Sequence, residues 1–116
     1  MDFKDKKVLV LGFSKSGMSA AKYLKSIGAD TYITEYREEK HEDKENIEEL
    51  FNLGINIEFG GHSDEFIKGS CIAVTSPGIP PKSEIMQKLS EKHIEVISEI
   101  ELAYLSTKKP FIAITG

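Results

Sequence analysis

At 116 residues with 40% hydrophobic side chains, the chain has the size of one domain and enough apolar material for one core, which excludes a second full domain. Its net charge of -4 gives no basic field for a nucleic-acid backbone, and no apolar run approaches the roughly 20 residues of a membrane-spanning helix. We therefore expect a soluble, cytoplasmic protein that binds neither nucleic acid nor a membrane.

Short β-branched runs alternate along the chain with segments of helical periodicity. The apolar run VLVL predicts a strand at 8–11, and the apolar spacing from Gly17 to Ile27 predicts a helix that ends at Gly28. Further strands are predicted at 31–34, 55–59, 71–75, 95–97 and 111–115, with helices around 47–51 and 85–89 and another that begins at Glu99. Ser98 and Glu101 form a capping box for that last helix.

Strands that are apolar on both faces and alternate with helices favour a parallel sheet covered on both sides. With right-handed crossovers, the predicted class is α/β, a doubly wound, Rossmann-like parallel sheet of five to six strands with helices on both faces. The charged residues 37–49 are interpreted as a solvated loop and helix face, with a partner surface as the alternative. Cys71 is interpreted as a buried core thiol, and three widely spaced histidines do not suggest a metal site.

Ligands of such sheets bind at the carboxyl ends of the strands, near the reversal in strand order. The turn from Gly12 to Gly17 follows the G-x-G-x-x-G spacing with Ser14 in place of the middle glycine, which disfavours the close approach of a dinucleotide's pyrophosphate. Ser14 and Ser16 offer hydroxyls, Lys15 offers a cation, and the helix N-terminus offers free N–H groups to an anion. A structural turn without a ligand is the alternative.

Two further segments belong to the same predicted edge. Glu35 follows the second strand, where an acidic residue commonly accepts hydrogen bonds from a ribose hydroxyl. Tyr36 is placed to stack on a base and Arg37 to meet a phosphate, although both also suit the start of a polar loop. The loop at 75–81 is stiffened by prolines, and Gly78 permits a backbone close to a ligand; a plain turn is the simpler alternative.

Five segments carry a resemblance that covers the whole chain: VLVLGFSKSG, TEYR, VTSPGIPP, VISEIEL and the final FIAITG. In this order and at these spacings they resemble the N-terminal domain of the Mur ligase family, on the branch that adds D-glutamate to UDP-N-acetylmuramoyl-L-alanine in peptidoglycan synthesis. The resemblance implies a domain that binds the UDP part of this substrate rather than a nicotinamide dinucleotide.

The resemblance also implies roles for individual residues. It places Ser14, Lys15, Ser16 and Gly17 on the diphosphate and the neighbouring ribose. It places Glu35, Tyr36 and Arg37 around the uridine, and Ser76, Pro77 and Gly78 near the sugar side of the diphosphate. The chain departs from the family at Glu35-Tyr36, where Asp-Thr or a similar pair is common.

The organisation of a full-length ligase follows from the same resemblance. Residues 1–110 would form the UDP-binding domain, and 111–116 would begin a central ATPase domain whose P-loop starts at Gly116. The full-length enzyme would be an ATP-dependent amide-bond ligase with ATP, Mg²⁺ and D-glutamate as its other reactants. The chain itself would hold no cofactor, catalytic residue or metal, and would bind its substrate as a monomer without turnover.

Two alternatives stay open. One is an NAD(P)-binding Rossmann domain of an oxidoreductase or redox sensor, which the first turn and Glu35 also suit. The other is a Mur ligase that adds a different amino acid.

Overall fold

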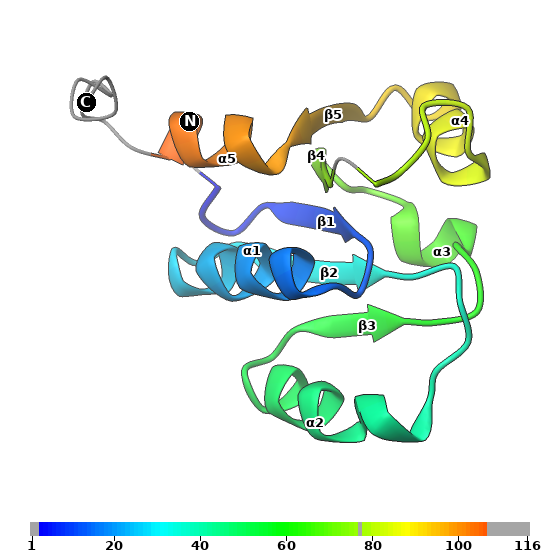
Figure 1. Ribbon diagram of the computed structural model, residues 1–116. Coiled ribbons are helices and arrows are strands. Elements are labelled where there is room, and N and C mark those ends of the chain that lie inside the picture. The colour runs from blue at the N-terminus through cyan, green and yellow to red at the C-terminus, as the bar shows by residue number, and fades with distance from the viewer. Residues whose placement is uncertain (1–2, 77, 107–116) are drawn as a thin grey trace, which may run out of the picture.

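The protein, in a computed structural model that describes residues 3–76 and 78–106, is a five-stranded parallel sheet between two layers of helices (Figure 1). Its elements are β1 (Lys7–Leu11), α1 (Lys15–Ser26), β2 (Asp30–Thr34), the 3₁₀ turn η1 (His41–Asp43), α2 (Lys44–Asn52), β3 (Asn56–Glu58), α3 (Asp64–Ile67), β4 (Ile72–Thr75), α4 (Glu84–Glu91), β5 (Glu95–Ser98) and α5 (Glu99–Ser106). Pro77, the strand predicted at 111–115 and Gly116 lie outside the described residues.

The strand order is β3-β2-β1-β4-β5, and every pair is parallel. The chain therefore moves outward from β1 in one direction, returns, and moves outward in the other, so the order reverses between β1 and β4. This confirms the predicted doubly wound, Rossmann-like α/β class. It also places the ends of β1, β2 and β4 next to one another at one edge of the sheet.

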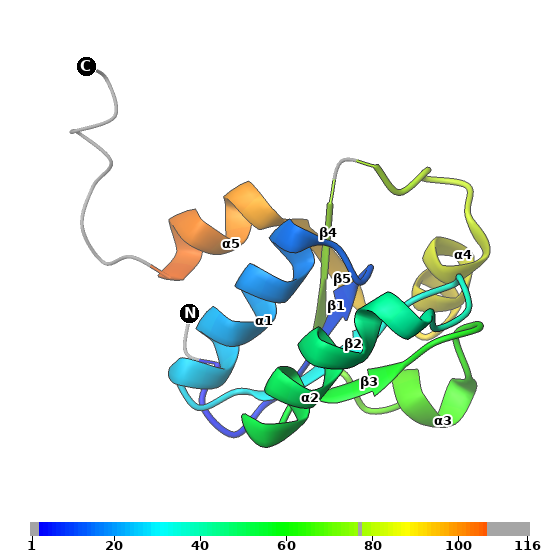
Figure 2. The ribbon, with the colours of Figure 1, turned by 60° about the horizontal axis from the view of Figure 1, so that its bottom comes forward.

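The central strand β1 is apolar at consecutive positions because it is buried on both faces. Val8 and Val10 pack into a core cluster with residues of α1, α2 and α5. Leu9 and Leu11 pack on the opposite face with residues of α3 and α4. Figure 2 shows these two helix layers on either side of the sheet.

The structure confirms two helix ends that capping residues in the sequence predicted, the end of α1 at Gly28 and the start of α5 after Ser98. Gly28 has φ +93° and its N–H donates to the carbonyl of Lys25 at 3.1 Å, which ends α1 in a left-handed turn. At α5 the N–H of Glu101 donates to Ser98 Oγ at 3.0 Å. Caps of this kind are local, so a sequence pattern is enough to find them.

The interpretation of Cys71 as a buried thiol is wrong, because its side chain is exposed. β4 begins at Ile72, one residue later than predicted. The N–H of Cys71 still donates to the carbonyl of Lys7 at 2.9 Å, so the backbone of Cys71 is hydrogen-bonded to β1. Its side chain is exposed because it precedes the first residue of β4, at the amino end of the strand. Residues 56–58 form β3 within the predicted 55–59.

Two short elements were not predicted. The helix α3 has four residues and η1 has three, and neither is long enough to show a helical period in the sequence. Within the described part of the chain, no helix has the length and apolar character needed to cross a bilayer.

Candidate functional site

The carboxyl ends of β1, β2 and β4 border a cleft of about 480 Å³. The cleft lies beside the reversal in strand order, where ligands of doubly wound sheets bind. Five of the predicted substrate-binding residues line it: Ser14, Glu35, Tyr36, Ser76 and Gly78. Lys15, Ser16, Gly17 and Arg37 lie outside this lining, and Pro77 lies outside the described residues.

The turn after β1 has its shape because of two glycines. Gly12 has φ +107°, a conformation that side chains disfavour, and its N–H donates to the carbonyl of Thr34 at 2.9 Å. A Cβ on Gly17 would lie 2.4 Å from the carbonyl oxygen of Gly12. Gly12 therefore permits the tight turn, and the absence of a side chain at Gly17 lets α1 begin directly against the backbone of Gly12.

The N-terminus of α1 presents unpaired donors beside the cleft. Ser14 caps the helix, because its Oγ accepts the N–H of Gly17 at 3.1 Å. The N–H groups of Lys15 and Ser16 have no partner among the described residues, and all three side chains from Ser14 to Ser16 are exposed. Two N–H groups at the positive end of a helix, with hydroxyls close by, suit an anionic ligand.

Glu35 connects the ends of the two neighbouring strands. One carboxylate oxygen accepts the N–H of Phe13 at 2.8 Å, and the other accepts the N–H of Arg37 at 3.1 Å. The side chain thereby holds the turn after β1 against the segment after β2. Each oxygen has a second lone pair, so the carboxylate is still able to accept a hydrogen bond from a ligand in the cleft.

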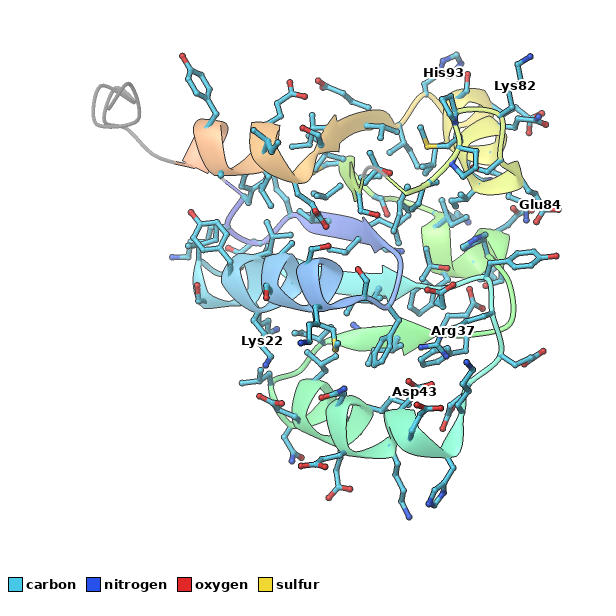
Figure 3. The ribbon with its side chains drawn as sticks, viewed as in Figure 1. Lys22, Arg37, Asp43, Lys82, Glu84 and His93 are labelled. Carbon is cyan, nitrogen blue, oxygen red and sulfur yellow. The ribbon has the colours of Figure 1, made fainter. Side chains whose placement is uncertain are left out.

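Arg37 is engaged on the other side of its segment, away from the cleft. Its guanidinium forms a bidentate pair with Asp43, with N–O distances of 2.8 and 3.1 Å, and lies 5.3 Å from the ring centroid of Phe59. The hydrogen bonds from Arg37, followed by the one from the Lys40 backbone, lower the pKa of Asp43 to about 2. Figure 3 shows Arg37 and Asp43 together on the side where η1 and α2 lie.

The loop after β4 forms the opposite wall of the cleft. The carbonyl of Ser76 accepts the N–H of Ile79 at 3.2 Å, which closes a turn. No described atom lies within 4 Å of a Cβ built on Gly78, and its φ is outside the left-handed region. The surrounding protein therefore leaves open space at Gly78.

Sequence reasoning missed four polar residues of the cleft lining: Thr34, His62, Ser83 and Glu84. The side chain of His62 is only 8% exposed, and its Nδ1 lies 2.7 Å from Thr34 Oγ1. Burial lowers the pKa of His62, while the nearby carboxylates of Glu35 and Glu84 oppose this shift. His62 lies in the loop after β3, four residues beyond Glu58, so the rule that selected Glu35 directly after β2 did not reach it.

Comparison with known proteins decides the family. The family model described as "Mur ligase MurD-like, N-terminal domain" matches residues 6–98. The chain belongs to the MurD-like N-terminal domain family. It is 42% identical over 117 residues to the UDP-N-acetylmuramoylalanine--D-glutamate ligase of Thermoanaerobacter pseudethanolicus, a match that covers 100% of this chain and 25% of that ligase.

The ligase of the same name from Streptococcus pneumoniae serotype 2 strain D39 is 42% identical over 115 residues, covering 98% of this chain and 25% of the relative. The MurD-like chain thus spans about a quarter of the length of these relatives. Relatives of this length carry three quarters of their residues outside the matched region.

Solved structures show the same fold at low sequence identity. A pseudomurein peptide ligase type C from Methanothermus fervidus matches 91% of this chain and 21% of its own with a TM-score of 0.73 and 24% identity. SirC, a precorrin-2 dehydrogenase, matches 83% of this chain and 45% of its own with a TM-score of 0.55 and 17% identity. Because a protein named as a dehydrogenase has a similar fold, the fold alone does not identify the ligand of this domain.

Proposed function

We propose that the chain is the UDP-binding N-terminal domain of an ATP-dependent ligase that adds D-glutamate to UDP-N-acetylmuramoyl-L-alanine in peptidoglycan precursor synthesis. The observation that carries the proposal is 42% identity, over the whole chain, to ligases with that activity in their names. A cleft at the strand reversal, bordered by the family's motifs, provides the place for the nucleotide. The cytoplasm, where nucleotide sugars are made, is the expected compartment.

The cleft suggests how the substrate would lie. The diphosphate would meet the free N–H groups of Lys15 and Ser16 at the start of α1, with the hydroxyls of Ser14 and Ser16 beside it and Gly17 keeping the helix end close. Ser76, Pro77 and Gly78 would approach the sugar side of the diphosphate, where the space beside Gly78 is open.

The uridine would lie toward the segment after β2. Glu35 would accept a hydrogen bond from a ribose hydroxyl while it continues to hold the first turn. Tyr36 would meet the nucleoside at the mouth of the cleft, where its side chain is 71% exposed. Arg37 would support the segment through Asp43, which differs from the direct uridine contact that the resemblance implies.

The remaining chemistry would belong to polypeptide beyond this domain. Residues 1–110 would form the substrate domain, and 111–116, ending at Gly116, would begin the ATPase domain that supplies ATP and Mg²⁺ chemistry to the D-glutamate addition. The relatives have three quarters of their length outside the match, which leaves room in them for such further domains. The chain alone would bind the UDP substrate as a monomer without turnover.

A nicotinamide-binding domain is the second candidate, since the sheet and Glu35 suit it. Ser14 disfavours it, because its Cβ stands where a dinucleotide fold uses glycine for close approach to the pyrophosphate. Calorimetric titration with UDP, UDP-N-acetylmuramoyl-L-alanine and NADH separates the two. We expect both uridine ligands to bind more tightly than NADH, and tighter binding of NADH would overturn the ligase assignment.

A further inference from the structure

The two walls of the cleft come from opposite sides of the strand reversal. One wall consists of the segments after β2 and β3, which contribute Glu35 and His62. The other wall consists of the loop after β4 and the first turn of α4, which contribute Gly78 and Glu84. A ligand that lies between the walls needs both at the right distance, so a contact that fixes this distance also affects the ligand's affinity.

Lys88, in the second turn of α4, joins the two walls. Its Nζ donates to the backbone carbonyl of His62 with an N–O distance of 2.7 Å and lies 3.8 Å from Asp64 Oδ1. The bond to His62 is the only hydrogen bond between the segments 34–67 and 75–94 among their described residues. The side chain of Lys88 is only 30% exposed, and a hydrogen bond from a charged donor is stronger than one between neutral groups.

The place of Lys88 on α4 shows what this bond holds. Glu84 and Ile85 line the cleft, and Lys88 lies four and three residues after them, on the same face of the helix. The helix face that borders the cleft is therefore the face that is bonded to the opposite wall. Packing of Ile85 and Leu89 in the core also holds α4 on the sheet, but apolar packing is not directional, whereas the hydrogen bond is.

On the opposite wall, His62 passes the effect of Lys88 on to the base of the cleft. The side chain of His62 is 8% exposed, and its Nδ1 lies 2.7 Å from Thr34 Oγ1, a contact that forms whichever of the two atoms carries the proton. The carbonyl of Thr34 in turn accepts the N–H of Gly12 at 2.9 Å. A continuous series of hydrogen bonds thus leads from α4 to the turn that precedes α1.

We propose that Lys88 is a positioning residue that fixes the width of the cleft for a ligand that contacts both walls, an inference that rests on the proposed UDP-binding function. Lys88 does not line the cleft, so it acts through His62 and α4 rather than by touching the ligand. Without this bond the ligand itself would have to fix the separation of the walls as it binds, and this ordering would reduce its affinity.

Titration calorimetry of residues 1–116 with UDP tests this inference. Lys88→Met removes the donor and keeps an unbranched apolar side chain, whereas Lys88→Arg keeps a charged donor. Lys92→Met is the matched control. Lys92 follows the last residue of α4 and lies 3.8 Å from the same Asp64 oxygen, but it makes no hydrogen bond to His62.

We expect Lys88→Met to weaken UDP binding about fivefold, since one charge-assisted hydrogen bond has an effect of this order. Lys88→Arg should retain most of the affinity, and Lys92→Met should bind UDP as the unaltered chain does. The ratio between Lys88→Met and the unaltered chain should stay the same from about 0.05 to about 0.5 M salt, because ions screen a general attraction for the diphosphate but not a change in the cleft's width.

Equal binding of UDP by Lys88→Met and the unaltered chain would overturn the positioning role and leave the proposed UDP site intact. Equal losses in Lys88→Met and Lys92→Met, or a loss that disappears at high salt, would also overturn it, because the charge alone would then explain the result. A loss in Lys88→Arg as large as in Lys88→Met would overturn it too.

Absence of UDP binding by the unaltered chain would overturn the proposed function and this inference together. Circular dichroism shows whether each variant folds. If Lys88→Met does not fold, Lys88→Gln takes its place in the comparison, because its side chain is polar but shorter than that of lysine.

Discussion

At the scale of single residues, Gly17 decides whether the turn after β1 closes. We expect Gly17→Ala to lower the free energy of unfolding by about 2–3 kcal/mol. The new Cβ would clash with the carbonyl oxygen of Gly12, and this oxygen belongs to the backbone, so it cannot rotate away as the end of a flexible side chain can. Urea denaturation followed by circular dichroism measures the change.

Gly78→Ala is the matched comparison for that experiment. It adds the same methyl group where no described atom lies within 4 Å, so the free energy of unfolding should change by less than about 0.5 kcal/mol. Equal destabilisation by the two substitutions would contradict the account of the first turn. The surroundings of Gly17 and Gly78 differ although both glycines belong to predicted ligand-binding motifs. The motif alone therefore does not say whether a glycine is needed for the fold or for space beside a ligand.

Residue types at the carboxyl ends of strands were the strongest signal for the site in the sequence. Ser14, Glu35 and Tyr36 were predicted from this rule, and all three line the cleft. Which partners these side chains have was not predictable, because the N–H of Phe13 reaches Glu35 only through the turn of the backbone. His62 was missed because its loop has no periodicity. Its position depends on hydrogen bonds to Thr34 at the end of β2 and to Lys88 in α4, both of which are distant in the sequence.

At the scale of elements, the Arg37–Asp43 pair fastens η1 to the segment after β2. Asp43 is buried and accepts both guanidinium hydrogen bonds as well as the N–H of Lys40 at 2.8 Å. The pKa of its carboxyl is lowered from 3.8 to about 2, so the native state holds this proton less tightly than the unfolded chain does. Its stabilising effect is therefore complete above about pH 4 and is lost as the pH falls through 2.

We expect Asp43→Asn to melt at a lower temperature than the unaltered chain at pH 7, because the charged pair and its hydrogen bonds are weakened. The difference should shrink as the pH is lowered from 4 to 2, where the unaltered carboxyl itself becomes protonated. Thermal denaturation followed by circular dichroism at several pH values measures both effects.

Glu49→Gln provides the control for this pair. Glu49 meets Lys22 at 2.8 Å on the surface, where the two side chains are 55% and 42% exposed, and surface pairs of this kind contribute little to stability. Its melting temperature should stay close to that of the unaltered chain. A constant difference between Asp43→Asn and the unaltered chain from pH 4 to 2 would show that the carboxyl charge is not the cause.

At the scale of the whole molecule, the cleft exists only in the folded state, because its walls come from segments far apart in the sequence. A ligand that binds the folded chain alone raises its stability by mass action, by about 2.7 kcal/mol at a free concentration near 100 times Kd. We expect UDP to raise the melting temperature in proportion to the logarithm of its concentration, and NADH to raise it less at the same concentration. Equal shifts from both would argue against a uridine site.

The sequence by itself determined the five strands and the four longer helices in chain order, together with the caps at Gly28 and Ser98. These properties depend on short-range patterns: apolar runs, the 3.6-residue period and residues such as Gly28 that end a helix locally. The sequence also indicated the edge of the sheet where a ligand binds, since parallel strands bring their carboxyl ends together.

Only the tertiary structure decided which side chains share the cleft and which are turned away from it. Arg37 is paired with Asp43, Cys71 is exposed, and His62 and Ser83 meet the cleft from two halves of the sheet. The physical reason is that burial and hydrogen bonding depend on neighbours contributed by distant segments. Those neighbours are set by the strand order and by the packing of helices on both faces, which no local pattern encodes.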